Sequence, residues 1–215
     1  MLDVCMKDYY LDGEERFGRF MSPLYDFVGR HLSRMMRFYD YVVSDLSKSD
    51  AKDILDVGTG SGTVPLMLYA KLKGSGRRIM ITGIDPSVHM LNIARHKTPS
   101  DAASSLRFML GSSRDVPGRR YDLIMSSISL HHWADKAGSL RNMKRHLKAN
   151  GEIRIYELDG HKAKREYRFL FYAIRSHTLS IGEARRLAAE AGLRVKRLER
   201  HGGFLKVVYV PRKRT

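Results

Sequence analysis

The hydrophobic and polar positions along this chain follow two different periods, one typical of strands and one typical of helices. Short apolar runs rich in β-branched residues are typical of buried parallel strands. They occupy residues 54–57, 79–84, 106–110, 121–126 and 153–158. Apolar residues spaced three and four apart are typical of amphipathic helices. They occupy residues 63–72, 86–96 and 134–149. Strands that alternate with helices in this way predict a doubly wound α/β fold.

The C-terminal part of the chain predicts one more helix and an antiparallel pair of strands. Ser180 and the glutamate three residues later have the spacing of a capping box, which predicts a helix over residues 181–191. Gly192 is placed to end that helix. The two segments that follow, 193–198 and 204–210, alternate around a pair of glycines and predict a closing hairpin.

The length of the chain and the breaks in its pattern predict a single domain over residues 1–215. Residues 50–158 hold the strand–helix alternation, and residues 180–215 hold the closing helix and hairpin. Two segments lie outside this plan. Residues 1–48 form an aromatic-rich N-terminal segment. Residues 159–179 predict an insertion helix, which we expect above the ligand cleft at the carboxyl ends of the strands.

Positive charge is concentrated at the end of the chain. Residues 1–160 contain 24 Lys and Arg against 19 Asp and Glu, whereas residues 161–215 contain 15 against 4, within a net charge of +16. Such an asymmetry favours a polyanionic partner or an acidic substrate, and a solvated basic surface gives the same count. Nucleic acid is therefore a possible partner.

The cysteine count and the hydropathy pattern predict a cytoplasmic protein. Cys5 is the only cysteine, so internal disulfides and cysteine-based metal sites are excluded. No apolar run approaches the length of a membrane span. Residues 1–30 contain acids and no apolar core of a signal peptide.

A glycine-rich loop follows the first predicted strand and precedes the first helix. The segment runs Asp56-Val-Gly-Thr-Gly-Ser-Gly62. Glycines allow a ligand to approach the backbone closely, and the N-terminus of the helix offers unpaired N–H groups. A dinucleotide-binding fingerprint needs a third glycine where Thr63 stands. An ordinary glycine-rich turn has the same core pattern, so the acid before the loop is what suggests a ligand.

The segment closely resembles motif I of the class I S-adenosylmethionine-dependent methyltransferases, and later motifs are similar to the group that acts on small molecules, as in quinone biosynthesis. The resemblance implies a Rossmann-like, doubly wound, seven-stranded sheet with helices on both faces, strand order 3-2-1-4-5-7-6 and an antiparallel last strand. It implies S-adenosyl-L-methionine as the cofactor. It also implies that the first loop holds the amino-acid end of that cofactor, through Asp56, Gly58, Thr59, Gly60 and Gly62.

A second acid, Asp85, ends the second predicted strand. An acid at the carboxyl end of the strand beside the glycine loop can accept hydrogen bonds from both hydroxyls of a ribose. The matching acid of the family has this role, and Pro86 resembles the residue that follows it. Alternatively, Asp85 caps the helix over residues 86–96, in which proline suits the first position.

The segment after the third predicted strand departs from the family pattern. In the family, an acid in a G-D-A-x-x-L-P pattern contacts the amino group of adenine. Ser112 occupies the position of that acid here, and Asp115 has the character of a turn residue. Either Ser112 and Ser113 meet the adenine through their backbone and hydroxyls, or adenine is recognised less tightly.

The segment after the fourth predicted strand, Ser126-Ser-Ile-Ser-Leu-His-His-Trp133, resembles that of small-molecule methyltransferases, which implies that Ser126 contacts the cofactor. It lacks the Asn/Asp-Pro-Pro-aromatic signature of enzymes that methylate exocyclic base nitrogens. His131 and His132 are the candidate catalytic residues, because a histidine can take a proton from the methyl acceptor. Alternatively, they shape the loop. Their spacing does not match a metal site.

Two further segments resemble the family less specifically. Many small-molecule methyltransferases cover the cleft with an N-terminal helical lid, and residues 30–46 have an amphipathic helical pattern. A Tyr-Asp element precedes it, so Tyr25 is a candidate cofactor contact. The segment 147–152, LKANGE, is similar to the family's L-K-P-G-G-x turn before the fifth strand. Asn150 replaces a glycine there, and asparagine tolerates the left-handed turn expected at that position.

Three functions agree with these residues. The first is methyl transfer from S-adenosylmethionine to a small-molecule acceptor, through carbon, oxygen or nitrogen. The second is methylation of RNA held by the basic C-terminal third. The third is binding of the cofactor without transfer, as a sensor or a partner subunit. The sequence specifies neither the acceptor nor the oligomeric state.

Overall fold

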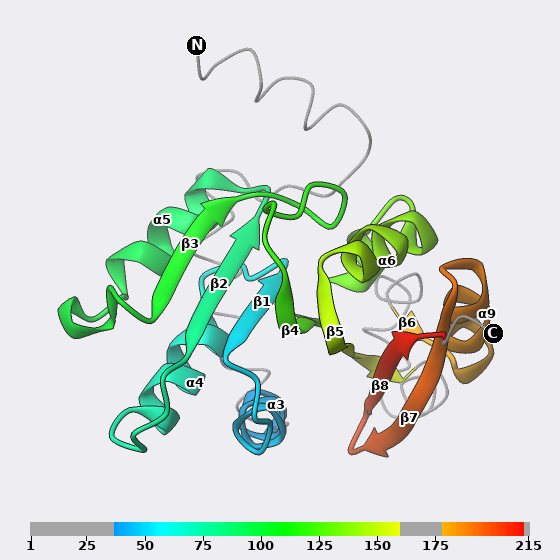
Figure 1. The fold of residues 1–215 in the computed structure, drawn as a ribbon, viewed down its shortest axis with the longest axis horizontal. Coiled ribbons are helices and arrows are strands. Elements are labelled where there is room, and N and C mark those ends of the chain that lie inside the picture. The colour runs from blue at the N-terminus through cyan, green and yellow to red at the C-terminus, as the bar shows by residue number, and fades with distance from the viewer. Residues whose placement is uncertain (1–36, 160–177, 213–215) are drawn as a thin grey trace, which may run out of the picture.

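The computed structural model describes residues 37–159 and 178–212, which form one mixed β-sheet with helices on both faces (Figure 1). The strands are β1 (Asp53–Val57), β2 (Met80–Asp85), β3 (Leu106–Leu110), β4 (Tyr121–Ser127), β5 (Leu147–Asp159), β6 (Thr178–Leu179), β7 (Leu193–His201) and β8 (Phe204–Pro211). The α-helices are α3 (Phe38–Ser47), α4 (Thr63–Leu72), α5 (Val88–His96), α6 (Lys136–Arg145) and α9 (Ile181–Glu190). Two short 3₁₀ turns are η1 (Ser100–Ala102) and η2 (Leu130–His132).

The main strands lie in the order β3-β2-β1-β4-β5-β8-β7. β1 to β5 run parallel, and β8 pairs antiparallel with both β5 and β7. The predicted strand order and the antiparallel last strand are therefore confirmed. The short β6 adds an eighth strand, parallel to β5, which the sequence pattern did not predict.

The strand order determines where a ligand site is expected. The chain runs outward from β1 to β3 and then returns to β4 on the other side of β1, so β1 and β4 flank the point where the winding reverses. Ligands of open α/β sheets bind there, beyond the carboxyl ends of the strands. We call this the carboxyl end of the sheet, and the end where β1 to β5 begin the amino end.

Each face of the sheet buries its own apolar core. On one face, α3, α4 and α5 contribute residues such as Val42, Leu68 and Leu91. On the other face, α6 and α9 contribute residues such as Leu140 and Leu187. The two-sided burial explains why the central strands are continuous apolar runs rather than alternating ones.

Helix α3 begins later than predicted. Arg37 has a left-handed backbone conformation with φ of 51°, so a single continuous helix over residues 30–46 is wrong, and α3 starts at Phe38. Residues 1–36 lie outside the described part of the chain. On α3, the Asp45 carboxylate accepts hydrogen bonds from Arg154 Nη1 at 2.9 Å and from the Tyr156 hydroxyl at 2.5 Å, which fastens the helix to β5.

Helix α5 begins two residues after the predicted start. Ser87 is its N-cap and accepts a hydrogen bond from the Met90 N–H at 3.3 Å. Pro86 therefore precedes the cap instead of occupying the first helical position. The alternative in which Asp85 caps this helix is wrong in that form, because Asp85 accepts a bond from the Ser87 N–H at 2.8 Å and only supports the capping residue.

The boundary between α6 and β5 differs most from the prediction. The expected helix over residues 134–149 ends at Arg145, and β5 already starts at Leu147. The register between β4 and β5 shifts near their amino ends, so the expected left-handed turn at Asn150 is instead an irregular stretch of strand with negative φ. A Cβ on Gly151 would lie 2.9 Å from the Tyr121 carbonyl oxygen, so glycine permits this close approach of the two strands.

The closing elements agree with the prediction. Ser180 accepts a hydrogen bond from the Glu183 N–H at 3.1 Å, as expected for the N-cap of α9. β7 and β8 form the predicted hairpin, although β7 extends to His201. The predicted insertion helix is wrong at both ends, since Asp159 belongs to β5 and Thr178–Leu179 form β6. Its remaining residues, 160–177, lie outside the described chain. In the described ranges, no helix is long and apolar enough to cross a membrane.

Candidate functional site

The glycine loop connects β1 to α4 at the carboxyl end of the sheet, at the reversal point described above. The backbone N–H groups of Gly58 and Thr59 both donate to the Ile84 carbonyl oxygen of β2, at 2.9 and 3.0 Å. Gly58 lies against the loop after β4, because a Cβ there would overlap the Ser129 hydroxyl. The loop is therefore held on two sides by the neighbouring strands.

Gly60, in the middle of the loop, faces open space. Its φ is 54°, and a Cβ at this position would meet no atom within 4 Å among the described residues. The left-handed backbone favours glycine here. Crowding by the described residues is not the reason for glycine at this position. The loop thus presents bare backbone to a space that a ligand can enter.

Asp85, the last residue of β2, holds the glycine loop through a side-chain hydrogen bond. Its Oδ2 accepts a hydrogen bond from the Gly60 N–H at 2.8 Å, and its Oδ1 accepts one from the Ser87 N–H at 2.8 Å. The side chain is buried, and each carboxylate oxygen can accept more than one bond. Asp85 therefore joins the glycine loop to the start of α5.

Asp56 lies one strand away, fully buried on β1. Its Oδ2 accepts a hydrogen bond from the Thr59 hydroxyl at 2.8 Å, while its Oδ1 has no hydrogen-bond partner within the described chain. Burial raises the pKa of Asp56 to about 7; the Thr59 hydrogen bond opposes this rise, and the charge of Asp85 adds to it. A buried carboxylate oxygen without a donor is costly, so it is well suited to a cationic or N–H-bearing ligand.

Ser126 presents a second buried oxygen of this kind. It lies on β4, directly after Met125, the residue that pairs with Asp56. Its side chain is 1% exposed, and its hydroxyl has no hydrogen-bond partner among the residues described. Two unsatisfied polar atoms at the carboxyl ends of β1 and β4 agree with a ligand that spans the reversal point.

Ser112 and Ser113 lie in the buried turn after β3. The Gly111 N–H donates to the Asp85 carbonyl oxygen at 3.3 Å, so the turn lies beside the acid predicted to bind the ribose. The Ser113 hydroxyl shares a 2.8 Å hydrogen bond with Ser139 of α6, and the Ser112 hydroxyl accepts a bond from the Arg114 N–H at 3.1 Å. Both hydroxyls already have protein partners, so adenine recognition by these serines stays a prediction.

The two histidines lie in η2, directly after β4. His131 Nδ1 is 3.1 Å from Glu157 Oε1, and both side chains are buried, at 6% and 1% exposure. The His132 ring lies 3.9 Å from the His131 ring, centroid to centroid. Glu157 also accepts a hydrogen bond from the Leu158 N–H at 3.1 Å through the same oxygen. This Nδ1–Oε1 contact is close but is not aligned as a hydrogen bond.

Glu157 is a site residue that the sequence analysis missed. It lies within the apolar run of β5, where an acid is expected only if it has a partner. Asp159, two residues further, is equally buried and pairs with Arg200 Nε at 2.7 Å. The signal that could have found both acids is their placement at alternate positions at the carboxyl end of β5, next to the apolar Tyr156 and Leu158.

The remaining predicted site residues divide into two groups. Gly62 lies at the start of α4, where it is the N-cap, and Pro86 lies between Asp85 and the cap of α5. Tyr25 lies outside the described residues. Within the described ranges, no cluster of three or more His, Cys, Asp or Glu side chains could hold a metal ion.

Comparison with known proteins gives one family. The family model described as "Methyltransferase domain" matches residues 48–192. A ubiquinone/menaquinone biosynthesis C-methyltransferase of Geotalea uraniireducens is 29% identical over 142 residues, covering 64% of this chain and 59% of that protein. A demethylmenaquinone methyltransferase of Thermotoga maritima is 30% identical over 142 residues, covering 64% of this chain and 58% of that protein. The chain therefore spans somewhat under 60% of the length of these curated relatives.

Solved structures show the same fold at lower sequence identity. An O-methyltransferase from neocarzinostatin biosynthesis, in complex with S-adenosyl-L-homocysteine and 1,4-dihydroxy-2-naphthoic acid, has a TM-score of 0.74 at 20% identity, covering 90% of this chain and 59% of that one. Magnesium protoporphyrin IX methyltransferase from Synechocystis, with bound S-adenosyl-L-homocysteine, has a TM-score of 0.63 at 16% identity, covering 83% and 84%. A putative methyltransferase of Haloferax volcanii, in complex with the activator Trm112, has a TM-score of 0.69 at 20% identity, covering 89% and 98%.

Proposed function

Because the chain belongs to the methyltransferase domain family, we propose that it transfers a methyl group from S-adenosylmethionine to a small-molecule acceptor. The observation that carries the proposal is the pair of buried acids around a glycine loop that faces open space. Asp56 and Asp85 are 1% and 8% exposed, and a Cβ on Gly60 would meet no atom of the described residues within 4 Å.

The residues present agree with this cofactor. The unsatisfied Asp56 Oδ1 and the first loop, with Gly58, Thr59 and Gly62, are placed to hold its ammonium and carboxylate groups. We assign Asp85 and Pro86 to the ribose. We assign the buried Ser112 and Ser113 to the adenine, and the buried Ser126 to the region between the two ends. The cofactor supplies an electrophilic methyl group on a sulfonium, so positioning is the main task left to the protein.

The proposed proton acceptor is His131. We assign the proton-accepting role to Nε2, because Nδ1 lies 3.1 Å from the Glu157 carboxylate. When the acceptor's oxygen or carbon gains the methyl group, the methyl–sulfur bond breaks and S-adenosylhomocysteine is left; His131 Nε2 would take the proton that the acceptor atom loses. Glu157 stabilises the resulting imidazolium without itself changing protonation.

The proposed acceptor is a hydroxylated aromatic ring. Two observations support it: curated relatives act in ubiquinone and menaquinone biosynthesis, and a solved relative is bound to a dihydroxynaphthoic acid. A phenolic or activated ring carbon loses a proton on methylation, which agrees with a buried histidine–glutamate pair beside the site.

The experiment uses S-adenosylmethionine labelled on its methyl group, incubated with the protein and a cell extract or a set of hydroxylated aromatic acids. We expect label in the organic-soluble fraction, lost in the His131→Ala variant although that variant still binds the cofactor. Label in RNA would contradict the proposal and support RNA methylation. Tight cofactor binding with no transfer to any fraction would support a non-catalytic module.

A further inference from the structure

A cavity of about 750 Å³ lies at the amino end of the sheet, at the end opposite the glycine loop. Its lining comes from the start of β4, the end of α6, the start of β5, the turn after α9 and the end of β8: Arg120, Lys144, Leu147, Lys148, Ala149, Gly192, Pro211 and Arg212. We call it the amino-end groove. β4 runs between the two ends, and its seven residues separate them by about 20 Å.

Half of the residues that line the groove are cations, and none is an acid. Lys148 is compensated, because its ammonium pairs with Asp53 and with Asp122, the latter at 3.0 Å. Arg120, Lys144 and Arg212 pair with no carboxylate among the described residues. The groove therefore carries three uncompensated positive charges.

These three cations are held in place by neutral acceptors. Lys144 Nζ donates to the Ala191 carbonyl oxygen at 2.9 Å, at the end of α9. Arg120 Nη1 donates to the Leu147 carbonyl oxygen at 3.0 Å, and Arg212 Nε donates to the Leu193 carbonyl oxygen, also at 3.0 Å. Carbonyl oxygens orient the side chains without cancelling their charge, and each cation keeps further N–H donors.

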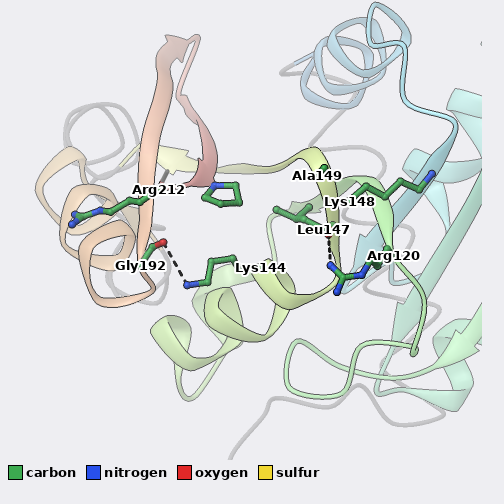
Figure 2. Close-up of a pocket in the computed structure, with 8 residues that line it drawn as sticks. Arg120, Lys144, Leu147, Lys148, Ala149, Gly192 and Arg212 are labelled. Atoms are coloured by element: carbon green, nitrogen blue, oxygen red, sulfur yellow. Dashed lines mark hydrogen bonds between the residues drawn. The ribbon is translucent and has the colours of Figure 1, made fainter. Parts of the chain in front are cut away.

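The cations are spread along the groove and do not converge on one point. Figure 2 shows Lys144 reaching across toward Gly192 and Arg120 lying below Leu147, while Arg212 and Lys148 extend away from one another at opposite ends. A single small anion needs donors that converge, whereas a chain of phosphates needs spaced cations.

We propose that the amino-end groove binds the phosphate backbone of a nucleic acid. No aromatic side chain lines it, so contact is expected through phosphates and without base selection. An anionic membrane is disfavoured, because surface binding to lipid usually adds exposed apolar side chains. The only large hydrophobic residue exposed in the described chain is Leu110, on β3 at the far side of the sheet. This inference goes beyond the proposed methyl transfer and does not depend on it.

The test is fluorescence anisotropy of a labelled single-stranded RNA of mixed sequence, titrated with the full chain over a range of salt concentrations. Three phosphate contacts predict a slope of about −2 in log affinity against log salt. The variant Arg120→Gln with Arg212→Gln keeps an amide donor for each carbonyl. It is expected to bind about tenfold more weakly, with the slope reduced by about 1.4.

The matched control is Arg185→Gln with Arg186→Gln, which removes two exposed positive charges from α9 outside the groove. We expect its affinity to stay within twofold of the unchanged protein. Equal losses in both double variants, no binding by the unchanged protein, or stronger binding to anionic vesicles than to RNA would each overturn the proposal. Retained affinity for S-adenosylmethionine shows that the variant is folded; if that affinity is lost, Lys144→Gln serves as the test variant.

Discussion

The two ends of the sheet handle charge in opposite ways. At the carboxyl end, four acids are buried, each 8% exposed or less: Asp56, Asp85, Glu157 and Asp159. At the amino end, the groove is lined by cations that remain half-buried or exposed: Arg120, Lys144, Lys148 and Arg212. The same sheet thus offers a negative, dehydrated site at one end and a positive, hydrated one at the other.

This difference indicates two different kinds of ligand. A buried acid with an unsatisfied oxygen, such as Asp56, strongly favours a positively charged group that replaces its lost water. An exposed cation binds weakly and in a salt-dependent way. The carboxyl end therefore suits a small cationic cofactor held in one orientation, and the amino end suits a polyanion held loosely.

The largest effect is expected at the carboxyl end, from removal of the proton acceptor. His131→Ala is predicted to lower kcat by about 10²–10⁴, the range for loss of a general base, with cofactor affinity unchanged. Glu157→Gln is predicted to lower kcat by a smaller factor and to leave KM unchanged, because the glutamate acts only through His131. A higher KM with an unchanged kcat would show that the pair shapes the loop instead.

A smaller effect concerns the pH dependence of stability. The pKa of Asp56 is raised to about 7 by burial, so the folded state binds this proton more tightly than the unfolded state. The stability that this proton contributes is complete below about pH 4 and is lost as the pH rises through 7. Asp56→Asn removes this pH dependence. The free energy of unfolding of the variant, relative to that of the unchanged protein, should therefore rise by on the order of 2 kcal/mol from pH 5 to pH 8.

Thermal unfolding of Asp56→Asn and the unchanged protein at pH 5, 6, 7 and 8 measures this difference. The exposed acid Asp101, which pairs with Lys73, provides the control, since Asp101→Asn should show no such gain with pH. A difference in Tm that stays constant over this range would show that the Asp56 carboxyl is not the source of the pH dependence.

The smallest effect comes from the glycine loop. Gly60→Ala places a Cβ at φ of 54°, which costs about 1 kcal/mol of stability. Gly74 is a matched control, because it has φ of 83° and a Cβ there would likewise meet no atom of the described ranges within 4 Å. Both variants should lose similar stability in denaturant unfolding. Only Gly60→Ala should lose affinity for S-adenosylmethionine, and equal affinities would show that the space beside Gly60 is not the cofactor site.

The parts of the fold that depend on local pattern could be predicted from the sequence. Helix α4 and strand β3 begin and end at the predicted residues, because the apolar period and the flanking glycines are both local signals. The sheet order was predicted from the resemblance of the glycine loop and of Asp85 to a known family. Roles toward the cofactor follow from the same resemblance and stay predictions.

The parts that depend on distant partners could not be predicted. Nothing in the sequence near Glu157 identifies its partner, because the fold alone brings it to His131, 26 positions earlier in the chain. The turn expected at Asn150 became part of β5, because pairing with β4 overrode the local preference. Charge counted along the sequence pointed to residues 161–215, yet Arg120 and Lys144 of the groove lie in the earlier part.

The most direct test of the account is the affinity for S-adenosylmethionine, measured by isothermal titration calorimetry with three proteins. The unchanged chain should bind it. Asp85→Ala should bind about 100-fold more weakly, because the Gly60 and Ser87 N–H groups and the ligand lose one charged acceptor. Arg120→Gln with Arg212→Gln should bind as tightly as the unchanged chain. No binding by the unchanged chain, or equal losses in both variants, would contradict the assignment of the cofactor to the carboxyl end of the sheet.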